Sequence, residues 1–199
     1  MSRDVVIVQT GTANTASVMA GLARAGAVPT LGADADTILT ADRVVLPGVG
    51  ALEAAMNRLR SDGLVEALKD RVAAGRPTLA ICLGLQLLCS FSEESPEVPG
   101  LGSIRGRVTR YPDTVLVPQM GWNRVEPDPA CRYVTAGFAY FANSYRLETA
   151  PAEWATARTD HAGPFVAAIE QGDVVACQFH PELSGVWGHD LLGRWIEGG

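Results

Sequence analysis

The sequence predicts an α/β protein built on one mixed, mostly parallel sheet. In its first half, short apolar strands alternate with helical segments, which is the pattern of βαβ winding. From residue 100 to residue 175 the pattern changes to short alternating strands separated by Gly, Pro and Asp, which we interpret as antiparallel additions to the same sheet. The 199 residues, 47% hydrophobic and 19% charged, suit one domain over residues 1–199, and no repeat or linker divides them.

Apolar periodicity and helix-ending glycines place the individual elements. Val18 and Leu22 form the inward side of the first helix, and Gly26 and Gly75 end two of the helices. In the first half the predicted strands are 5–8, 27–31, 43–46 and 79–81, and the predicted helices are 15–25, 51–59 and 64–74. In the second half the predicted strands are 105–111, 140–145, 154–158, 165–170 and 174–179, followed by an amphipathic helix around Leu191, Leu192 and Trp195.

Cys82 lies where a buried strand over residues 79–81 turns directly into an apolar helical segment over Leu83–Leu88. A sharp strand-to-helix elbow exposes its central side chain, and the helix N-terminus favours a thiolate there. Gly84 lets the start of the helix approach the sheet without a Cβ clash. The sequence therefore predicts a cysteine nucleophile, although a buried core cysteine remains the alternative.

His180 and Glu182 follow the last predicted strand and flank Pro181. In an extended stretch, residues two apart point to the same side, so both side chains can face the pocket of Cys82. A histidine can act as base toward the thiol and as acid toward a leaving amine, while a carboxylate holds its ring. We therefore predict a Cys82–His180–Glu182 triad for acyl transfer, in a cysteine-dependent amidohydrolase.

Residues 81–86 (ICLGLQ) and 178–182 (QFHPE) resemble the nucleophile and histidine–glutamate motifs of the class I, or triad, glutamine amidotransferases. The resemblance spans nearly the whole chain. Within the family, residues 46–50 (LPGVG), 117–123 (VPQMGWN) and 140–145 (YFANSY) are most similar to the glutaminase subunits of imidazole glycerol phosphate synthases. The resemblance implies a flavodoxin-like three-layer sandwich with a central mixed, mostly parallel sheet. It also implies hydrolysis of L-glutamine through a cysteinyl thioester, with ammonia passed to a cyclase partner for histidine biosynthesis.

The resemblance assigns further residues to the site. It implies an oxyanion hole formed by Gly48, Val49 and Leu83, completed by a peptide flip between Gly48 and Val49. A plain strand-to-helix turn would explain those glycines equally well without a nucleophile nearby. The implied substrate-binding residues are Gly50, Gln86, Glu94, Ser144 and Tyr145. A carboxylate such as Glu94 suits an α-ammonium group, although it would also be ordinary in a solvated loop.

The expected partner is a barrel-shaped cyclase subunit that forms a heterodimer with this chain. Trp122 is the best candidate for the docking surface and would flank the ammonia exit, unless it fills a gap in the core from a glycine-flanked turn. The implied interface residues are Gln119, Trp122, Asn123 and Leu183. Three positions depart from the family pattern, since Gln119 and Asn143 stand where histidine is common and Leu183 where lysine or arginine is usual. The loop over residues 9–14 departs as well and matches only at Gly11 and Asn14.

Composition excludes several classes of function. A net charge of -6 and a pI near 5.0 argue against nucleic acid as a partner. No apolar run is long enough for a bilayer span, and the N-terminus shows no signal-peptide pattern. The four cysteines have neither metal-ligand spacing nor the pattern of a disulfide framework, which is consistent with a reducing cytoplasm. We therefore expect no metal, no cofactor and a cytoplasmic location.

Two other functions stay open at this point. One is another triad enzyme, either a glutaminase that serves a different synthase or a γ-glutamyl hydrolase. The other is a non-catalytic regulatory module that retained the fold. Activity measured with each synthase, and labelling of Cys82 by a glutamine-analogue electrophile, distinguish the three.

Overall fold

Five parallel strands form the half of the sheet that carries the predicted catalytic segments. The computed structural model describes residues 3–11 and 14–198 of the chain. In spatial order the strands are β2 (Val28–Gly32), β1 (Asp4–Val8), β3 (Arg43–Leu46), β4 (Thr78–Ile81) and β12 (Val174–Cys177). Every residue of β3, β4 and β12 is buried, as expected for strands covered on both faces. Their carboxyl ends meet at one edge, from which the predicted catalytic segments leave.

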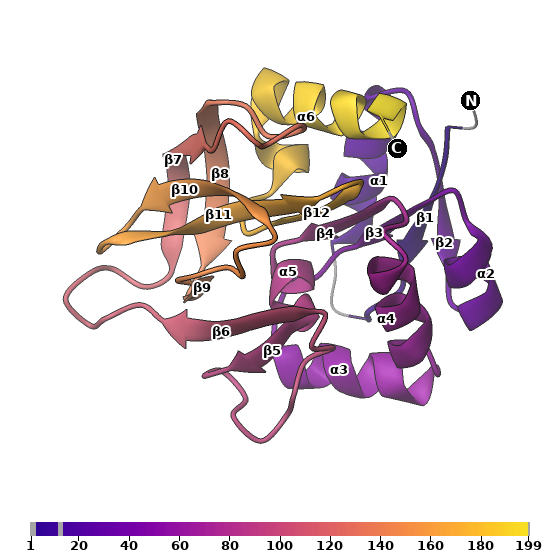
Figure 1. Ribbon diagram of the computed structural model, residues 1–199, viewed down its shortest axis with the longest axis horizontal. Coiled ribbons are helices and arrows are strands. Elements are labelled where there is room, and N and C mark those ends of the chain that lie inside the picture. The colour runs from indigo at the N-terminus through magenta and orange to yellow at the C-terminus, as the bar shows by residue number, and fades with distance from the viewer. Residues whose placement is uncertain (1–2, 12–13, 199) are drawn as a thin grey trace.

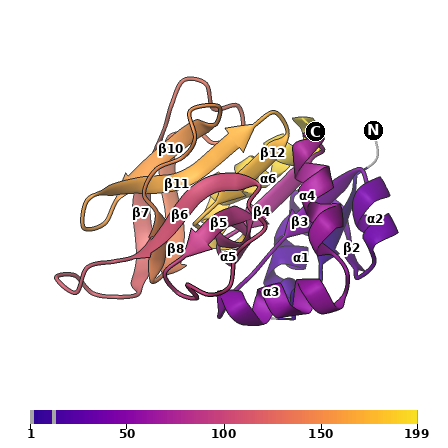
Figure 2. The ribbon, with the colours of Figure 1, turned by 60° about the horizontal axis from the view of Figure 1, so that its bottom comes forward.

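Helices cover both faces of this parallel half (Figure 1). On one face lie α1 (Thr15–Arg24) and α6 (Gly185–Gly198), and on the other lie α2 (Ala35–Thr40), α3 (Leu52–Ser61), α4 (Val65–Ala73) and α5 (Leu83–Leu88). Figure 2 shows α3 and α4 in front of the strands. Alternate side chains of β1 pack into the two layers, with Ile7 toward α1 and α6 and Val8 toward the other helices. The predicted three-layer arrangement is therefore confirmed.

Most predicted elements of the first half form within a residue or two of their expected limits. Val18 and Leu22 are buried on α1, and Gly26 follows that helix with a φ of 93°. α2 was not predicted, because a helix of six residues is too short for a periodic apolar pattern. Its N-terminus is capped by Asp34, whose Oδ1 accepts the Thr37 N–H at 2.8 Å.

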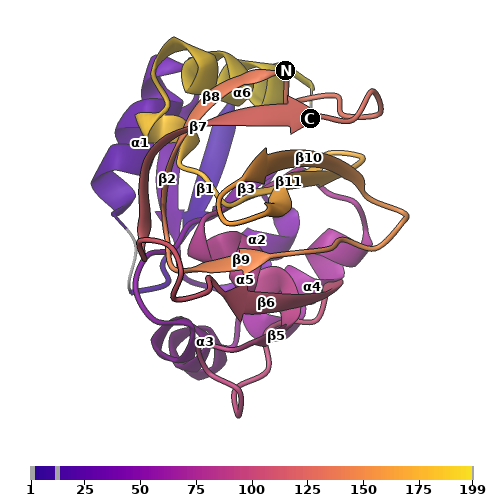
Figure 3. The same cartoon turned by 90° about the vertical axis from the view of Figure 1, so that its left-hand side faces the viewer.

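The second half extends the sheet with antiparallel strands. From β12 the order continues through β11 (Pro164–Gln171), β10 (Ala155–Asp160), β7 (Gln119–Pro127) and β8 (Gly137–Asn143), while β5 (Cys89–Ser92), β6 (Ile104–Arg110) and β9 (Tyr145–Leu147) branch from it. All twelve described strands belong to one sheet, and Figure 3 shows the antiparallel half from its outer side.

Two expectations for this half were wrong. Residues 140–145 do not form one strand, because the chain leaves the ladder at Ser144 between β8 and β9. No strand was predicted over residues 120–123, and the alternative interpretation of Trp122 placed them in a turn, but they lie in β7, where Trp122 pairs with Tyr140 of β8. Gly121 interrupts the alternating pattern by which a strand is recognised in the sequence. The strand nevertheless forms, because β8 supplies its hydrogen-bonding partners.

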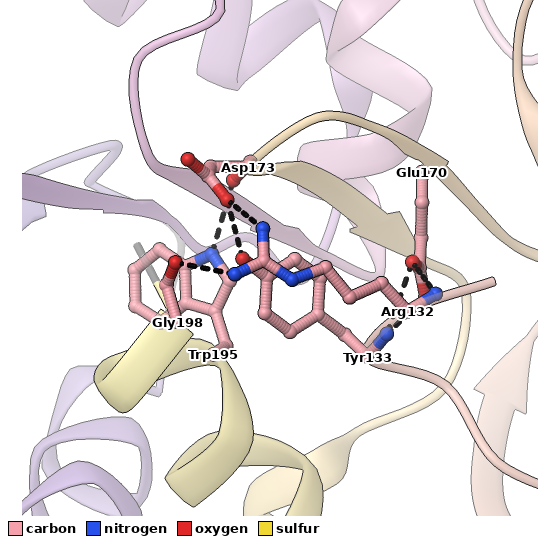
Figure 4. Close-up of polar contacts among 6 residues, drawn as sticks. All are labelled: Arg132, Tyr133, Glu170, Asp173, Trp195 and Gly198. Carbon is pink, nitrogen blue, oxygen red and sulfur yellow. Dashed lines mark hydrogen bonds and ion pairs between the residues drawn. The ribbon is translucent and has the colours of Figure 1, made fainter.

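Hydrogen bonds hold the carboxyl end of α6 against the sheet, at the edge opposite the predicted site (Figure 4). Arg132 donates to the Asp173 carboxylate and to the Gly198 carbonyl oxygen, both at 2.8 Å. The Trp195 indole N–H donates to the Asp173 carbonyl oxygen at 3.2 Å. The Glu170 carboxylate in turn accepts the backbone N–H of Arg132 at 2.6 Å. These contacts fix the helix that begins at Gly185, three residues after Glu182.

Candidate active site

Cys82 occupies a strained joint between β4 and α5. Its backbone has φ 53° and ψ -107°, which is uncommon for a residue with a side chain, and its N–H donates to the Cys177 carbonyl oxygen at 2.7 Å. Gly84 permits the close approach behind it, because a Cβ there would lie 2.0 Å from the Leu46 carbonyl oxygen. The joint has the elbow geometry that the sequence predicts, and Cys82, although only 6% exposed, lines a cavity.

The His180 ring and the Glu182 carboxylate form a buried pair. Nδ1 of His180 lies 2.9 Å from Oε1 of Glu182, and only 3% of the Glu182 side chain is exposed. The expectation of an extended stretch was wrong, because Pro181–Leu183 forms a turn of 3-10 helix. Pro181 fixes φ at a value suited to the first helical position, and the Leu183 N–H bonds back to the His180 carbonyl oxygen at 3.1 Å. The turn brings the two side chains together.

Electrostatics set the protonation of this pair. Burial lowers the pKa of His180, but hydrogen bonds with Cys82 and Glu182, together with their charges, raise that pKa to about 10. Burial raises the pKa of Cys89 and of Cys131 to about 12, so both remain thiols at neutral pH. At neutral pH the His180 ring is therefore protonated beside the one cysteine that lines the cavity.

The cavity in front of Cys82 and His180 measures about 360 Å³. All the residues that the resemblance assigns to the substrate line it, namely Gly50, Gln86, Glu94, Ser144 and Tyr145. Its size and polar lining suit a small polar molecule. A larger cavity of about 530 Å³ lies on the other side of Glu182, between α1 and α6, and does not reach Cys82.

Two of these lining residues also have structural partners. Oε2 of Glu94 accepts the N–H of Leu52 at 2.9 Å, at the start of α3. Nε2 of Gln86 donates to Oε1 of Gln178 at 3.0 Å. Glu94 thus keeps one carboxylate oxygen for a ligand, and Gln86 orients a neighbouring amide.

The predicted oxyanion hole is closed in this structure. The Leu83 N–H donates to the Gly48 carbonyl oxygen at 3.3 Å, so that carbonyl occupies the place of an oxyanion. A side chain at Gly48 would collide with Leu83, because a Cβ would lie 2.8 Å from the Leu83 Cβ. Val49 follows at the mouth of the cavity. The hole can form only if the peptide between Gly48 and Val49 turns over.

The four predicted interface residues differ in exposure. Trp122 is 56% exposed and Leu183 is 45% exposed, so the interpretation of Trp122 as a plug in the core is wrong. Gln119 is only 6% exposed, and the Asn123 amide donates to the Asp160 carbonyl oxygen at 2.7 Å. Four exposed apolar side chains form what we call the rim patch, consisting of Met120, Trp122, Leu183 and Val186. Leu183 and Val186 line the same cavity as Glu182, and Trp122 approaches Gly185.

Gln178 was not predicted to be a functional residue, yet its Nε2 donates to Sγ of Cys82 at 3.5 Å. Two glycines that let helices approach the His180–Glu182 turn were not predicted either. A Cβ on Gly21 would lie 2.8 Å from the Glu182 Cβ, and one on Gly188 would lie 2.0 Å from the Pro181 carbonyl oxygen. Both glycines lie in helices, and the pattern of apolar residues that identifies a helix gives no sign of their role. Of the unusual loop over residues 9–14, residues 12 and 13 lie outside the described residues.

Comparison with known proteins gives one consistent family. Residues 6–195 match the family model described as glutamine amidotransferase class-I. Curated relatives named imidazole glycerol phosphate synthase subunit HisH include those of Mycolicibacterium paratuberculosis (43% identity, 98% of each chain) and Escherichia coli (41% identity, 98% of this chain and 99% of that one). The relative of Symbiobacterium thermophilum is 40% identical over 96% of this chain and 92% of its own.

Solved structures agree at the level of the fold. A crystal structure of a glutamine amidotransferase superposes with a TM-score of 0.74, at 18% identity over 96% of each chain. The structure of PurLQS from Thermotoga maritima gives a TM-score of 0.73, at 14% identity over 99% of this chain and 98% of that chain.

Proposed function

This chain belongs to the class-I glutamine amidotransferase family, and we propose that it is the glutaminase subunit of an imidazole glycerol phosphate synthase. In this role it hydrolyses L-glutamine to L-glutamate and ammonia, and a synthase partner uses the ammonia. The observation that carries the proposal is that Cys82 and His180 line one cavity while Glu182 holds the His180 ring, in a chain about 40% identical to such subunits over nearly its whole length. We propose that residues 1–199 act as one amidotransferase domain.

The chemistry begins with attack by the Cys82 sulfur on the carboxamide carbon of glutamine. The C–N bond breaks as the protonated His180 ring delivers its proton to the leaving nitrogen, which departs as ammonia. A γ-glutamyl thioester remains on Cys82. The now neutral ring then takes a proton from water, whose oxygen attacks the thioester and releases glutamate. Glu182 holds the ring through Nδ1, so that Nε2 serves both transfers.

The other residues that line the cavity bind glutamine and stabilise the oxyanion that forms during the reaction. Glu94 suits the α-ammonium of glutamine, and Gly50, Ser144 and Tyr145 surround the rest of the amino acid. The developing oxyanion is held by the N–H groups of Leu83 and Val49 once the Gly48–Val49 peptide has turned over. The closed hole supports a resting state of low activity in the isolated chain.

The partner is a barrel-shaped cyclase subunit that docks as a heterodimer on the rim patch. Three features support this assignment: the patch is apolar, it includes an exposed tryptophan, and it adjoins Glu182 through Leu183. Because Leu183 replaces the usual basic residue, docking at this point is apolar rather than ionic. Trp122 flanks the ammonia exit. The protein works in the cytoplasm, where its thiol nucleophile stays reduced. Among the described residues, no helix combines the length and the hydropathy needed to cross a bilayer.

The test is glutamine hydrolysis measured with and without the cyclase subunit and its ribonucleotide substrate. We expect little turnover by the chain alone and strong stimulation by the loaded cyclase. Turnover that is high without a cyclase would favour a γ-glutamyl hydrolase, and stimulation only by another synthase would favour a different amidotransferase. An absence of turnover with every partner, and of Cys82 labelling by a glutamine-analogue electrophile, would indicate a regulatory module.

A further inference from the structure

Gln178 is a fully buried amide in contact with the sulfur of Cys82. In the parallel pair of β4 and β12, Ile81 lies beside Cys177. The residues that follow them, Cys82 and Gln178, therefore also lie side by side. Nε2 of Gln178 donates to Sγ of Cys82 at 3.5 Å. The Gln178 backbone is fixed as well, because its N–H donates to the Ala167 carbonyl oxygen at 2.8 Å.

The orientation of the Gln178 amide follows from its neighbours. The backbone carbonyl of Tyr145 can only accept hydrogen bonds, and it lies 3.4 Å from Nε2 of Gln86. That contact identifies the Gln86 nitrogen as the atom that also faces Oε1 of Gln178, at 3.0 Å. Because its oxygen accepts from Gln86, the Gln178 amide must present its N–H₂ group to the sulfur.

A second side-chain amide also contacts the Tyr145 carbonyl oxygen. Nδ2 of Asn143 donates to the Tyr145 carbonyl oxygen and to the Tyr111 hydroxyl, both at 2.9 Å. The Tyr111 hydroxyl then donates to Oε1 of Gln119 at 2.8 Å. Burial raises the pKa of Tyr111, so this donor stays neutral. Asn143 and Gln119, which depart from the family pattern, therefore belong to one network of neutral groups that fixes the Tyr145 carbonyl.

We propose that Gln178 is a further catalytic residue, which stabilises the Cys82 thiolate by donating an amide N–H to its sulfur. This inference rests on the proposed role of Cys82 as the nucleophile. A donor of this kind favours the thiolate over the thiol, because a hydrogen bond to a charged acceptor is stronger than one to a neutral acceptor. Gln86 acts as a positioning residue that turns the Gln178 donor toward the sulfur.

The test is the pH dependence of Cys82 alkylation by iodoacetamide in the full chain, followed by mass spectrometry of the peptide that contains Cys82. Gln178→Met keeps the length of the side chain but removes the donor. We expect the inflection of its rate–pH profile to move upward by about one unit, which is about tenfold slower alkylation below the inflection. Gln178→Glu should move it further upward because of the added negative charge.

Two further variants complete the experiment. Gln86→Met leaves the Gln178 amide in place but frees its orientation, so a smaller upward shift is expected. Thr159→Val is the matched control, since it also exchanges a buried polar group for an apolar one, and the Thr159 hydroxyl is not part of this network. Its profile should coincide with that of the unmodified chain. Cooperative unfolding of each variant shows that it is folded.

An unchanged inflection in a folded Gln178→Met chain would overturn the inference. If that variant does not fold, an unchanged inflection in both Gln178→Glu and Gln86→Met would overturn it as well. Alkylation needs neither glutamine nor a partner. A shifted inflection in a chain without glutaminase turnover would therefore contradict the proposed function alone, while normal turnover with an unshifted inflection would contradict only the role of Gln178.

Discussion

The backbone N–H of Leu83 donates a hydrogen bond to the carbonyl oxygen of Gly48 across 3.3 Å. The donor that should stabilise a tetrahedral intermediate is thus already satisfied by the protein. A partner that turned the peptide between Gly48 and Val49 would remove this carbonyl and present the Val49 N–H in its place. Under the proposed function, activation would then require a change in the orientation of this one peptide group, and a glycine at position 48 would keep both orientations accessible.

Removal of the Val49 N–H should therefore impair the activated enzyme. Val49→Pro lacks this donor, and we expect kcat of the cyclase-stimulated reaction to fall by about 10²–10³. Val49→Ala retains the N–H and should lose far less. The measurement is steady-state glutamine hydrolysis at saturating cyclase and ribonucleotide. Equal kcat values for the two variants would show that the Val49 N–H is not an oxyanion donor.

The protonation of His180 should depend on Cys82. We expect its ring to stay protonated through neutral pH and to lose its proton near pH 10, as followed by NMR of the ring. Cys82→Ala removes a hydrogen bond and a charge that raise this pKa, so the proton should be lost at lower pH in that variant. Hydrolysis of glutamine should be abolished as well. A pKa that is the same in both proteins would contradict the coupling of the two side chains.

Two glycines of α6 test whether close packing of this helix supports the His180–Glu182 turn, because only one of them contacts the turn. Gly188→Ala should destabilise the fold by about 1–3 kcal/mol and lower kcat, because the new Cβ would lie 2.0 Å from the Pro181 carbonyl oxygen. Gly193→Ala meets no atom within 4 Å and should stabilise the helix by about 0.5–1 kcal/mol. Urea unfolding of both variants measures the difference. Equal free energies of unfolding would rule out a tight contact at Gly188.

The rim patch should contribute to cyclase affinity through its tryptophan. Trp122→Ala removes an exposed aromatic anchor, and we expect the affinity for the cyclase to fall by about 2 kcal/mol, roughly thirtyfold in Kd. Leu31→Ala is the control, because Leu31 is 48% exposed on β2 at the other end of the sheet. Titration of each chain with labelled cyclase gives Kd. Unchanged binding of Trp122→Ala would place the interface elsewhere.

Several parts of the molecule could be predicted because they depend on local patterns. The elbow at Cys82 follows from an apolar strand, a cysteine and a glycine two residues later, all within one short segment. β1, β3, β4 and β12 consist mainly of apolar residues, which made them recognisable in the sequence. β7 was not, because its alternation is interrupted by Gly121 and its ladder depends on a partner strand elsewhere in the chain.

The sequence by itself determined the α/β class and the residue types that the chemistry requires. The tertiary structure decided what each of those residues touches. The register of β4 against β12 sets Gln178 beside the sulfur, and the packing of Gly48 on α5 decides that the Leu83 N–H is already bonded. The physical reason is that strand register and helix packing come from contacts between segments far apart in the chain, which no local pattern of residues encodes.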